Sequence, residues 1–376
     1  MLGMLGGGQL GRFFVIAARK LGYAVTVLDP DPRSPAGSLA DAHVVAAYDD
    51  TAALDRLAAE CAAATTEFEN VPASALAYLA RFIPVRPAAD CVAATQDRIA
   101  EKLFLRSHDF PCVPHVAVKT DADLAALPAD LYPGVLKVSR LGYDGKGQRR
   151  VTSAADIESA FRDFGNEPSV LERFVPLDNE LSVVLTRGVD GRTACYPVVE
   201  NRHRHGVLDV SIAPARVPAN LRAEAEATAL RLADRLEFVG TLAVEYFVSG
   251  GRLYVNEIAP RPHNSGHYTL DACVADQFEQ QARALCGVPL GETRQHSAAV
   301  MVNLLGDLWY RNGAAGAQEP DWGKLLAIPT LKLHLYGKHE ARRGRKMGHY
   351  TVIDADPARA LETAMAARAA LGVPNE

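Results

Sequence analysis

Two neighbouring segments decide the fold: Val135-Leu136-Lys137-Val138 and Gly142-Tyr143-Asp144-Gly145-Lys146-Gly147-Gln148. The first is typical of a short buried strand, where Lys137 is costly unless it meets an anion. The three glycines of the second allow the backbone to fold over phosphate groups, and Lys146 adds a mobile cation. The alternative for the loop alone is an ordinary hairpin tip. Together, the two segments predict a site for a phosphate-bearing ligand.

A second part of the same site is expected at Leu171-Glu172-Arg173-Phe174-Val175-Pro176, where a predicted strand ends and the chain turns at a proline. Backbone N–H and C=O groups in such a turn can face an adenine edge. Glu180 then begins the next strand. On its own it is more typical of a solvated charge than of a ribose ligand, but its place in this order of parts favours the ribose.

Paired carboxylates are expected farther along the chain. The strands Leu242–Val248 and Leu253–Ile258 flank Ser249-Gly250-Gly251-Arg252, which predicts a hairpin. Each strand carries one carboxylate among apolar residues, Glu245 and Glu257. Since Mg²⁺ prefers oxygen ligands and often binds one or two carboxylates, the pair suits a magnesium site.

The turn decides whether these carboxylates share a face. A two-residue turn at Gly250-Gly251 pairs Glu245 with Asn256 in a regular hairpin, whereas a three-residue loop that includes Arg252 pairs Glu245 with Glu257. We predict the three-residue loop.

Ile258-Ala259-Pro260-Arg261-Pro262-His263-Asn264-Ser265-Gly266-His267 follows at once and is too rich in prolines for a regular element. Arg261 can clamp an oxyanion bidentately, and His263 and Asn264 add hydrogen-bonding groups. The segment is expected to line a cleft; a stiff connecting loop is the alternative.

The N-terminus offers a competing interpretation. Gly6-Gly7-Gly8-Gln9-Leu10-Gly11 matches G-x-G-x-x-G, and Asp29 ends the next strand at the distance expected for dinucleotide binding. An NAD-dependent oxidoreductase is therefore a candidate, and a plain tight turn is another. Because any phosphate ester suits a glycine-rich helix N-terminus, we favour a different phosphate-bearing substrate.

The predicted elements divide the chain into three parts. The first, residues 1–94, alternates strands and helices and indicates a parallel α/β unit, with strands at Met1–Leu5, Ala24–Leu28 and Ala64–Glu67 and helices at Leu10–Lys20, Thr51–Ala62 and Ala73–Ala80. The second, residues 95–290, is rich in strands and has a lid subdomain at about 112–175. It begins with a helix near Asp97–His108, ends with one at Gln277–Leu285, and has further strands at Ser169–Glu172, Leu181–Thr186 and Thr193–Val199. The third, residues 291–376, is expected to hold strands Ala298–Asn303 and Lys332–Tyr336 and helix Pro357–Leu371.

Composition narrows the class of protein. The 376 residues are 48% hydrophobic with a net charge of −5, and charges of both signs are interspersed, which argues against binding of nucleic acid or an anionic membrane. The six cysteines are scattered and are expected to be reduced. The sequence begins without a signal-peptide pattern and holds no apolar run of membrane-spanning length, so a cytoplasmic protein is expected.

In this order, Lys137, the 142–148 loop, residues 172–175, Glu180 and the Glu245/Glu257 pair resemble the ATP-grasp superfamily. Within it, four segments resemble the 5-(carboxyamino)imidazole ribonucleotide synthases of purine biosynthesis: Gly6–Gly11, Thr66-Glu67-Phe68-Glu69-Asn70-Val71, Gly142–Gln148 and Asn256–His267. The resemblance implies an α/β ATP-grasp fold with an N-terminal Rossmann-like parallel domain, a central ATP-grasp domain and a small C-terminal domain.

The resemblance also implies roles for individual residues. ATP would be contacted by Arg98, Lys137, Gly142, Tyr143, Asp144, Gly145, Lys146, Gly147, Gln148, Glu172, Arg173, Phe174, Val175, Glu180, His203, Asn256 and Glu257. Mg²⁺ would be held by Glu245 and Glu257, and the substrate ribonucleotide would lie near Gly8, Gln9, Leu10, Glu67, Tyr143, Asp144, Arg261, Lys338, Arg345 and Lys346.

Some of these roles come from the resemblance alone. From its own residues, Asn201–His205 is expected to be a solvated charged loop in which His203 is an exposed imidazole. Arg342–Lys346 is likewise expected to be a solvated loop. Ala259 stands where many members of the superfamily have a metal-binding asparagine, which leaves the number and coordination of the magnesium ions open.

The implied reaction is that of a carbon–nitrogen ligase. Bicarbonate would attack ATP to form carboxyphosphate, with Arg261, His263 and Asn264 as orienting groups, and 5-aminoimidazole ribonucleotide would take up the carboxyl group while Asp144 accepts a proton. The alternatives are a formate-using ATP-grasp enzyme acting on glycinamide ribonucleotide, an NAD-dependent oxidoreductase, and a nucleotide-binding protein without turnover. The family resemblance also suggests a homodimer.

Overall fold

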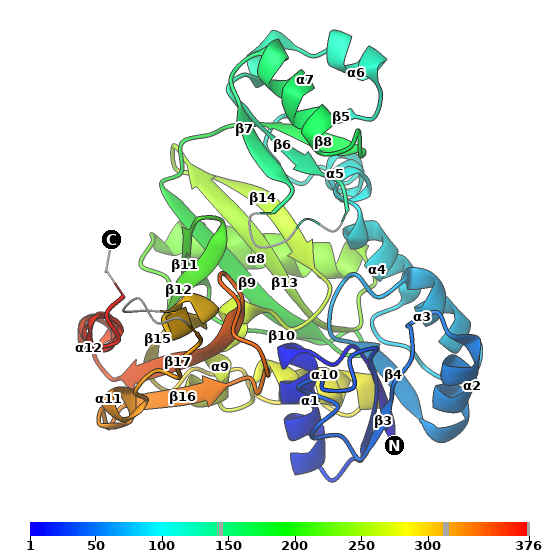
Figure 1. Ribbon diagram of the computed structural model, residues 1–376, viewed down its shortest axis with the longest axis vertical. Coiled ribbons are helices and arrows are strands. Elements are labelled where there is room, and N and C mark those ends of the chain that lie inside the picture. The colour runs from blue at the N-terminus through cyan, green and yellow to red at the C-terminus, as the bar shows by residue number, and fades with distance from the viewer. Residues whose placement is uncertain (141, 143–145, 311–315, 374–376) are drawn as a thin grey trace.

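The computed structural model describes residues 1–140, 142, 146–310 and 316–373. It contains three sheets, and the first is a parallel four-stranded sheet of order β3-β2-β1-β4 near the N-terminus (Figure 1). Its strands and the helices that connect them are β1 Leu2–Leu5, α1 Gln9–Lys20, β2 Val25–Leu28, β3 Ala42–Val44, α2 Thr51–Glu60, β4 Ala63–Thr66 and α3 Ala73–Leu79. The predicted parallel α/β unit is confirmed. Since β1 runs directly into α1, the helix N-terminus lies at the carboxyl edge of the sheet.

Two helices lead from this sheet to the rest of the molecule, α4 Ala89–Gln96 and α5 Arg98–Ser107. Asp97 caps α5, because its side chain accepts hydrogen bonds from the amides of Ile99 and Ala100. The helix predicted at Asp97–His108 is therefore confirmed. Three residues of α5 that turn out to matter for the site, Arg98, Glu101 and Lys102, lie on its buried side.

A small antiparallel sheet of order β5-β8-β6-β7 stands at the end of the molecule opposite the N-terminus (Figure 1). Helix α7 packs on it through a separate apolar core that includes Leu136, Ile157 and Phe161. The elements of this part are β5 His115–Val118, α6 Asp121–Ala125, the 3₁₀ turn η1 Ala129–Leu131, β6 Gly134–Val138, β7 Gln148–Val151, α7 Ala154–Asp163 and β8 Ser169–Arg173.

The third sheet is the largest, with strand order β14-β13-β9-β11-β12-β15-β17-β16 and β10 beside β9. Its strands are β9 Asn179–Arg187, β10 Thr193–Cys195, β11 Val199–Arg204, β12 Val207–Ala213, β13 Gly240–Ser249, β14 Arg252–Ala259, β15 Ala298–Leu305, β16 Leu331–Leu335 and β17 Lys346–Asp354. The accompanying helical elements are α8 Ala219–Arg235, η2 Asn264–Gly266, α9 Thr269–Ala272, α10 Gln277–Cys286, η3 Gly306–Tyr310, α11 Gly323–Leu326 and α12 Pro357–Ala370. Because β12 pairs with β15, the C-terminal strands extend the sheet that carries the Glu245/Glu257 hairpin.

Two expectations about this sheet are wrong. The single strand predicted at Thr193–Val199 is divided into β10 and β11, and the buried Tyr196 between them donates from its hydroxyl to the Ala275 carbonyl at 2.8 Å. The segment from Asn201 onward, expected to be a solvated loop, forms β11 as far as Arg204. It is ordered by pairing, since the Asn201 side chain donates to Ser182 at 2.9 Å in the sheet interior.

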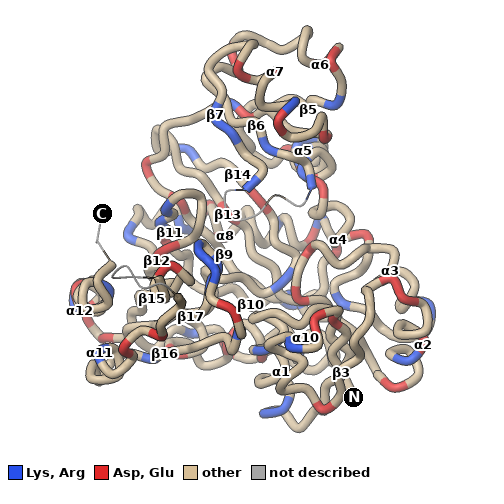
Figure 2. The backbone as a smooth tube through the Cα atoms, in the orientation of Figure 1, with Lys and Arg blue, Asp and Glu red and all other residues tan. Residues whose placement is uncertain are grey.

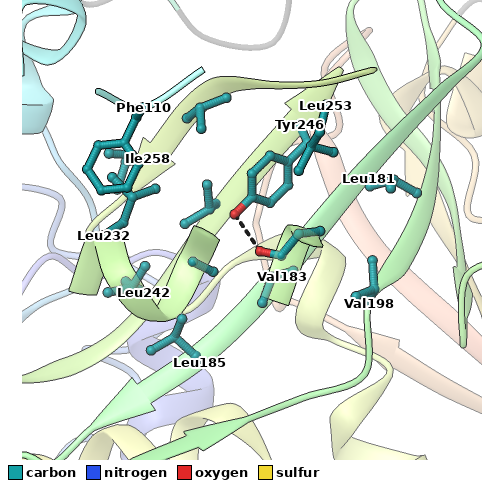
Figure 3. Close-up of a cluster of buried hydrophobic side chains, with 14 of the residues drawn as sticks. Phe110, Leu181, Val183, Leu185, Val198, Leu232, Leu242, Tyr246, Leu253 and Ile258 are labelled. Carbon is teal, nitrogen blue, oxygen red and sulfur yellow. Dashed lines mark hydrogen bonds between the residues drawn. The ribbon is translucent and has the colours of Figure 1, made fainter. Parts of the chain in front are cut away.

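The main core lies between this sheet and α8. In Figure 3, Leu181, Val183, Leu185 and Leu242 from the strands meet Leu232 from the helix. Burial of such apolar side chains is the main favourable term in folding. The hydroxyl of the fully buried Tyr246 donates to the Ala225 carbonyl at 2.9 Å, so its one polar atom is satisfied.

Acidic and basic residues are interspersed along the backbone tube in Figure 2. The intermixing seen in the sequence therefore persists in three dimensions. None of the helices in the described part of the chain is long and apolar enough to cross a bilayer.

Candidate active site

The hairpin of β13 and β14 brings Glu245 opposite Glu257, but not in the predicted way. The turn is the two-residue Gly250-Gly251, with φ of +56° and +71°, so the three-residue loop is wrong. Positive φ at both positions is what glycine permits and what a tight hairpin needs. A one-residue register shift, which leaves Asn256 as an extra residue in β14, then restores the pairing of the two glutamates.

The two glutamates form an acidic pair that suits a divalent cation. Oε1 of Glu245 lies 3.3 Å from Nε2 of His263, and Oε2 of Glu257 accepts from Nη1 of Arg98 at 3.0 Å. Burial, together with the negative charges of Glu257 and Glu180, raises the pKa of Glu245. A cation between the carboxylates would relieve this repulsion, and hard oxygen donors are what Mg²⁺ prefers. The residues present therefore fit magnesium.

His203 is not the exposed imidazole expected from its neighbours. It lies on β11, its side chain is 20% exposed, and its Nδ1 lies 3.0 Å from Oε2 of Glu180 on β9. Burial disfavours a charged imidazole, but Glu180 and Glu245 outweigh that effect and raise the pKa of His203. The structure thus brings His203 to the same side of the sheet as the acidic pair.

Lys137 meets a carboxylate, as its burial requires, and the partner is Glu172. Lys137 Nζ lies 2.7 Å from Oε2 of Glu172, whose other oxygen lies 3.1 Å from Nζ of Lys102. Lys102 is 1% exposed and Glu172 is 2% exposed. The two ammonium groups outweigh the effect of burial and hold the pKa of Glu172 well below its usual range.

The same buried cluster contacts the hairpin of β13 and β14 through Asn256. Its side-chain oxygen lies 3.4 Å from Nζ of Lys137, and its carbonyl accepts from Lys102 at 2.9 Å. Lys102 was missed from sequence. Its signal is its position in α5 four residues after Arg98, which places both cations on one face of the helix.

The glycine loop connects β6 to β7, so it is also the tip of a hairpin. Tyr143, Asp144 and Gly145 lie outside the described residues. The Gly142 carbonyl accepts from Nη2 of Arg98 at 3.2 Å, which joins the loop to the acidic pair. Gly147 has φ +68°, and a Cβ there would lie 2.4 Å from Cγ2 of Val138, so a side chain would be both strained and obstructed. Lys146 and Gln148 belong to the second half of the loop, and Gln148 begins β7.

The residues after Glu257 fold back against the site. The amide of Ser265 donates to Nδ1 of His263 at 3.3 Å, which makes that nitrogen an acceptor and leaves the ring proton on Nε2, facing Glu245. Burial lowers the pKa of His263 well below its usual range, so the imidazole is neutral. His263 is therefore suited to orient Glu245. The Asn264 side chain forms a reciprocal amide pair with Asn303, which gives it a structural function.

Arg261 contacts a residue that was not among the predicted site residues. Its Nε donates to Oε2 of Glu69, in the loop after β4, and its Nη1 donates to the Pro262 carbonyl at 3.2 Å. Burial disfavours the charge on each partner, but the ion pair outweighs it and lowers the pKa of Glu69 while raising that of Arg261. Glu69 lies within the Thr66–Val71 segment, which supplied the only sequence signal for it.

At the N-terminus of α1, the amides of the glycine run meet protein carboxylates. Gly8 and Gly11 each donate to Glu67 at 2.5 Å, and Gly7 donates to Asp29 at 2.6 Å. Asp29 also accepts from the Tyr48 hydroxyl, so the carboxylate that the dinucleotide fingerprint would assign to a ribose is used inside the protein. Burial raises the pKa of Glu67 to about 7. Gln9 and Leu10 form the first turn of α1 beside this carboxylate.

Two C-terminal lysines lie near the carboxylates of these sites, Lys338 near Glu67 and Lys346 near Glu245. The positive charge of Lys338 lowers the pKa of Glu67, and that of Lys346 lowers the pKa of Glu245, so Lys338 lies near α1 and Lys346 near the acidic pair. Nζ of Lys338 donates to the Lys346 carbonyl at 2.7 Å. Arg345 donates to the Glu340 carbonyl at 3.0 Å and faces the charge of Asp31. Lys346 begins β17 rather than lying in a solvated loop.

Comparisons with known proteins agree with this arrangement. Residues 1–96 match a ribonucleotide synthetase preATP-grasp domain, residues 103–278 an ATP-grasp domain, and residues 299–363 a phosphoribosylaminoimidazole carboxylase C-terminal domain. The chain is 42% identical to N5-carboxyaminoimidazole ribonucleotide synthase of Bacillus subtilis, over 93% of this chain and 90% of that protein. It is 43% identical to the protein of that name from Brucella melitensis, over 94% and 96%.

Solved structures give the same result. The synthetase from Thermus thermophilus superposes with a TM-score of 0.90 at 38% identity, covering 100% of this chain and 99% of that one. The Aspergillus clavatus synthase, solved with ADP and 5-aminoimidazole ribonucleotide, has a TM-score of 0.89 at 30% identity, with 99% and 98% covered. The mixed α/β architecture with its ATP-grasp centre is thus shared along the whole chain. The chain belongs to the N5-carboxyaminoimidazole ribonucleotide synthase family of ATP-grasp proteins.

Proposed function

We propose that this protein carboxylates 5-aminoimidazole ribonucleotide with ATP and bicarbonate, giving N5-carboxyaminoimidazole ribonucleotide, ADP and phosphate in purine biosynthesis. One observation carries the proposal beyond family membership. The acidic pair Glu245/Glu257, the buried lysine cluster and Arg261 converge on one hairpin, so a metal-bound phosphate and a small oxyanion can lie side by side.

ATP is the proposed co-substrate, bound between the small antiparallel sheet and the largest sheet. Lys137 and the glycine loop would face its phosphates, and the turn after Glu172 would face its adenine. Glu180 and His203, already joined at 3.0 Å, would face its ribose. Glu245 and Glu257 would hold Mg²⁺, which when bound neutralises charge on the phosphoryl oxygens.

The first chemical step is the attack of a bicarbonate oxygen on the γ-phosphorus of ATP, with ADP as the leaving group and carboxyphosphate as the product. Arg261 would bind the bicarbonate oxyanion, because its guanidinium is partly buried, lies near the charges of Glu69 and Glu257, and stays charged. His263 would hold Glu245 in place through its Nε2 proton. Asn264, paired with Asn303, would keep this segment in position.

The second step joins the carboxyl group to the ribonucleotide. The exocyclic amine attacks the carboxyl carbon of carboxyphosphate, or CO₂ released from it; phosphate departs, and the amine proton passes to Asp144. The ribonucleotide phosphate would lie at Gly8–Leu10 near Lys338, and the aminoimidazole near Glu67 and Tyr143. Closing the glycine loop over the site would exclude water from the mixed anhydride.

The decisive experiment measures ADP release by the purified protein with ATP and Mg²⁺, with bicarbonate and aminoimidazole ribonucleotide added singly and together, and identifies the product by mass spectrometry. We expect full turnover only with both. Formate with glycinamide ribonucleotide, and NADH absorbance, are measured in parallel. ATP turnover that needs neither bicarbonate nor aminoimidazole ribonucleotide would refute the proposal. We also propose a homodimer, which light scattering tests directly.

A further inference from the structure

Glu69 connects the N-terminal sheet to the oxyanion-binding arginine. It lies in the loop after β4, and its Oε2 accepts from Nε of Arg261, 192 residues farther along the chain. Gln96 on α4 contacts this loop, because its side-chain nitrogen donates hydrogen bonds to the backbone carbonyls of Glu69 and Val71. The side-chain oxygen of Gln96 in turn accepts from Arg140 at 3.3 Å. The backbone at Glu69 is therefore held in place by Gln96.

We propose that Glu69 is a positioning residue, which orients the Arg261 guanidinium toward bicarbonate. This inference rests on the proposed function. Nε of Arg261 is taken by Glu69 and Nη1 by the Pro262 carbonyl, whereas Nη2 makes no hydrogen bond within the described part of the chain. One edge of the guanidinium is thus anchored to protein, and one nitrogen remains for an oxyanion. A guanidinium that is already held by the protein on one side loses less rotamer entropy when it binds a ligand than a freely rotating one does.

The same loop also carries Glu67, which accepts from Gly8 and Gly11 at the N-terminus of α1. Glu67 and Glu69 therefore connect the expected ribonucleotide site and the expected bicarbonate site through one short segment. Because Glu69 contacts Arg261, bicarbonate use, rather than ATP binding, should depend on Glu69.

The test compares Glu69→Gln and Glu69→Ala with wild type, measuring KM for bicarbonate, KM for ATP, and carboxylated product formed per ADP. Glu69→Ala should raise KM for bicarbonate at least about 10-fold, equivalent to about 1.4 kcal/mol of binding. It should also lower product per ADP, with KM for ATP within about twofold of wild type. Glu69→Gln keeps an acceptor for Nε and should recover part of the loss. The exposed Glu167→Gln is the matched control and should behave as wild type.

A double-mutant cycle with Arg261→Ala separates positioning from a general structural effect. If Glu69 acts through Arg261, the Glu69→Gln change should have no further effect on bicarbonate KM in the Arg261→Ala background. An equal effect in both backgrounds, or an unchanged bicarbonate KM in both Glu69 variants, overturns the proposal. If circular dichroism shows that Glu69→Ala does not fold, the double-mutant cycle of Glu69→Gln with Arg261→Ala tests the proposal by itself. If the wild-type protein forms no carboxylated product that depends on bicarbonate, the proposed function itself is refuted, and this inference with it.

Discussion

Glu245 on β13 pairs with Glu257 on β14 although their two-residue turn would, in a regular hairpin, pair Glu245 with Asn256. The extra residue in β14 does two things. It returns Glu257 to the face of Glu245, and it sends the Asn256 carbonyl to Lys102. The acidic pair and the buried cluster around Lys102 therefore both depend on the same irregularity in β14.

Replacing either member of the acidic pair should therefore abolish most activity. Glu245→Gln and Glu257→Gln each remove one carboxylate from the proposed Mg²⁺ site, and we expect kcat to fall on the order of 100-fold, as when a preorganised electrostatic group is removed. Titration of Mg²⁺ in the ADP-release assay should show a higher half-saturating concentration. Glu224→Gln, on the exposed side of α8, is the control. Unchanged Mg²⁺ dependence in both variants would argue against the site.

Lys102 should be more important for stability than any exposed lysine. Lys102→Met leaves Glu172 with only one of its two cations in a buried setting, and breaking a buried pair costs about 3–5 kcal/mol. Urea unfolding followed by circular dichroism measures this loss. Lys119→Met, at an exposed position, should change the free energy of unfolding by less than about 0.5 kcal/mol. A Lys102 variant as stable as that control would contradict the expectation.

Glu101 should make stability depend on pH. Its Oε1 accepts from the Ile258 amide at 2.6 Å, and burial with the charge of Glu257 raises its pKa to about 8, from an ordinary value of 4.5. Between these values the native state binds more protons than the unfolded chain. Glu101 therefore makes its full contribution to the free energy of unfolding below pH 4.5, and this contribution is lost as the pH rises through 8.

Glu101→Gln tests this, because it keeps an oxygen for the Ile258 amide and carries no charge. From pH 5 to 8, the free energy of unfolding of wild type should fall relative to the variant, by up to about 1.4 kcal/mol per pH unit. Urea unfolding at several pH values gives the difference. Parallel pH profiles for the two proteins would show that Glu101 ionises normally in the native state.

The core between α8 and the largest sheet should respond to loss of volume. Leu232 is fully buried among Val183, Leu185 and Leu242 (Figure 3), so Leu232→Ala should cost about 2–5 kcal/mol of unfolding free energy. Leu326 is 63% exposed, and its replacement by alanine is the matched control. Urea unfolding of both variants provides the measurement, and equal stability would contradict this account of the core.

Local patterns were enough to predict many elements. Alternation of short apolar strands with helices predicted the parallel sheet around β1, and a helix was also predicted correctly near Asp97–His108, where the structure has α5. These predictions succeed because hydrophobic periodicity acts over a few residues. The prediction of a solvated loop at Asn201 failed for the opposite reason, because this residue is held in a strand by partners on β9 that are distant in the chain.

The sequence by itself determined the type of protein, because the buried lysine, the glycine loop and the carboxylate pair occur in a recognisable order. Tertiary structure decided which groups meet. The turn at Gly250-Gly251 and the shift at Asn256 set the face of Glu257, and long-range packing brought Lys102 to Glu172 and Glu69 to Arg261. Charges buried in a low-dielectric interior must find partners, and those partners come from wherever the fold places them. That is why the residue types at this site could be predicted from sequence and its pairings could not.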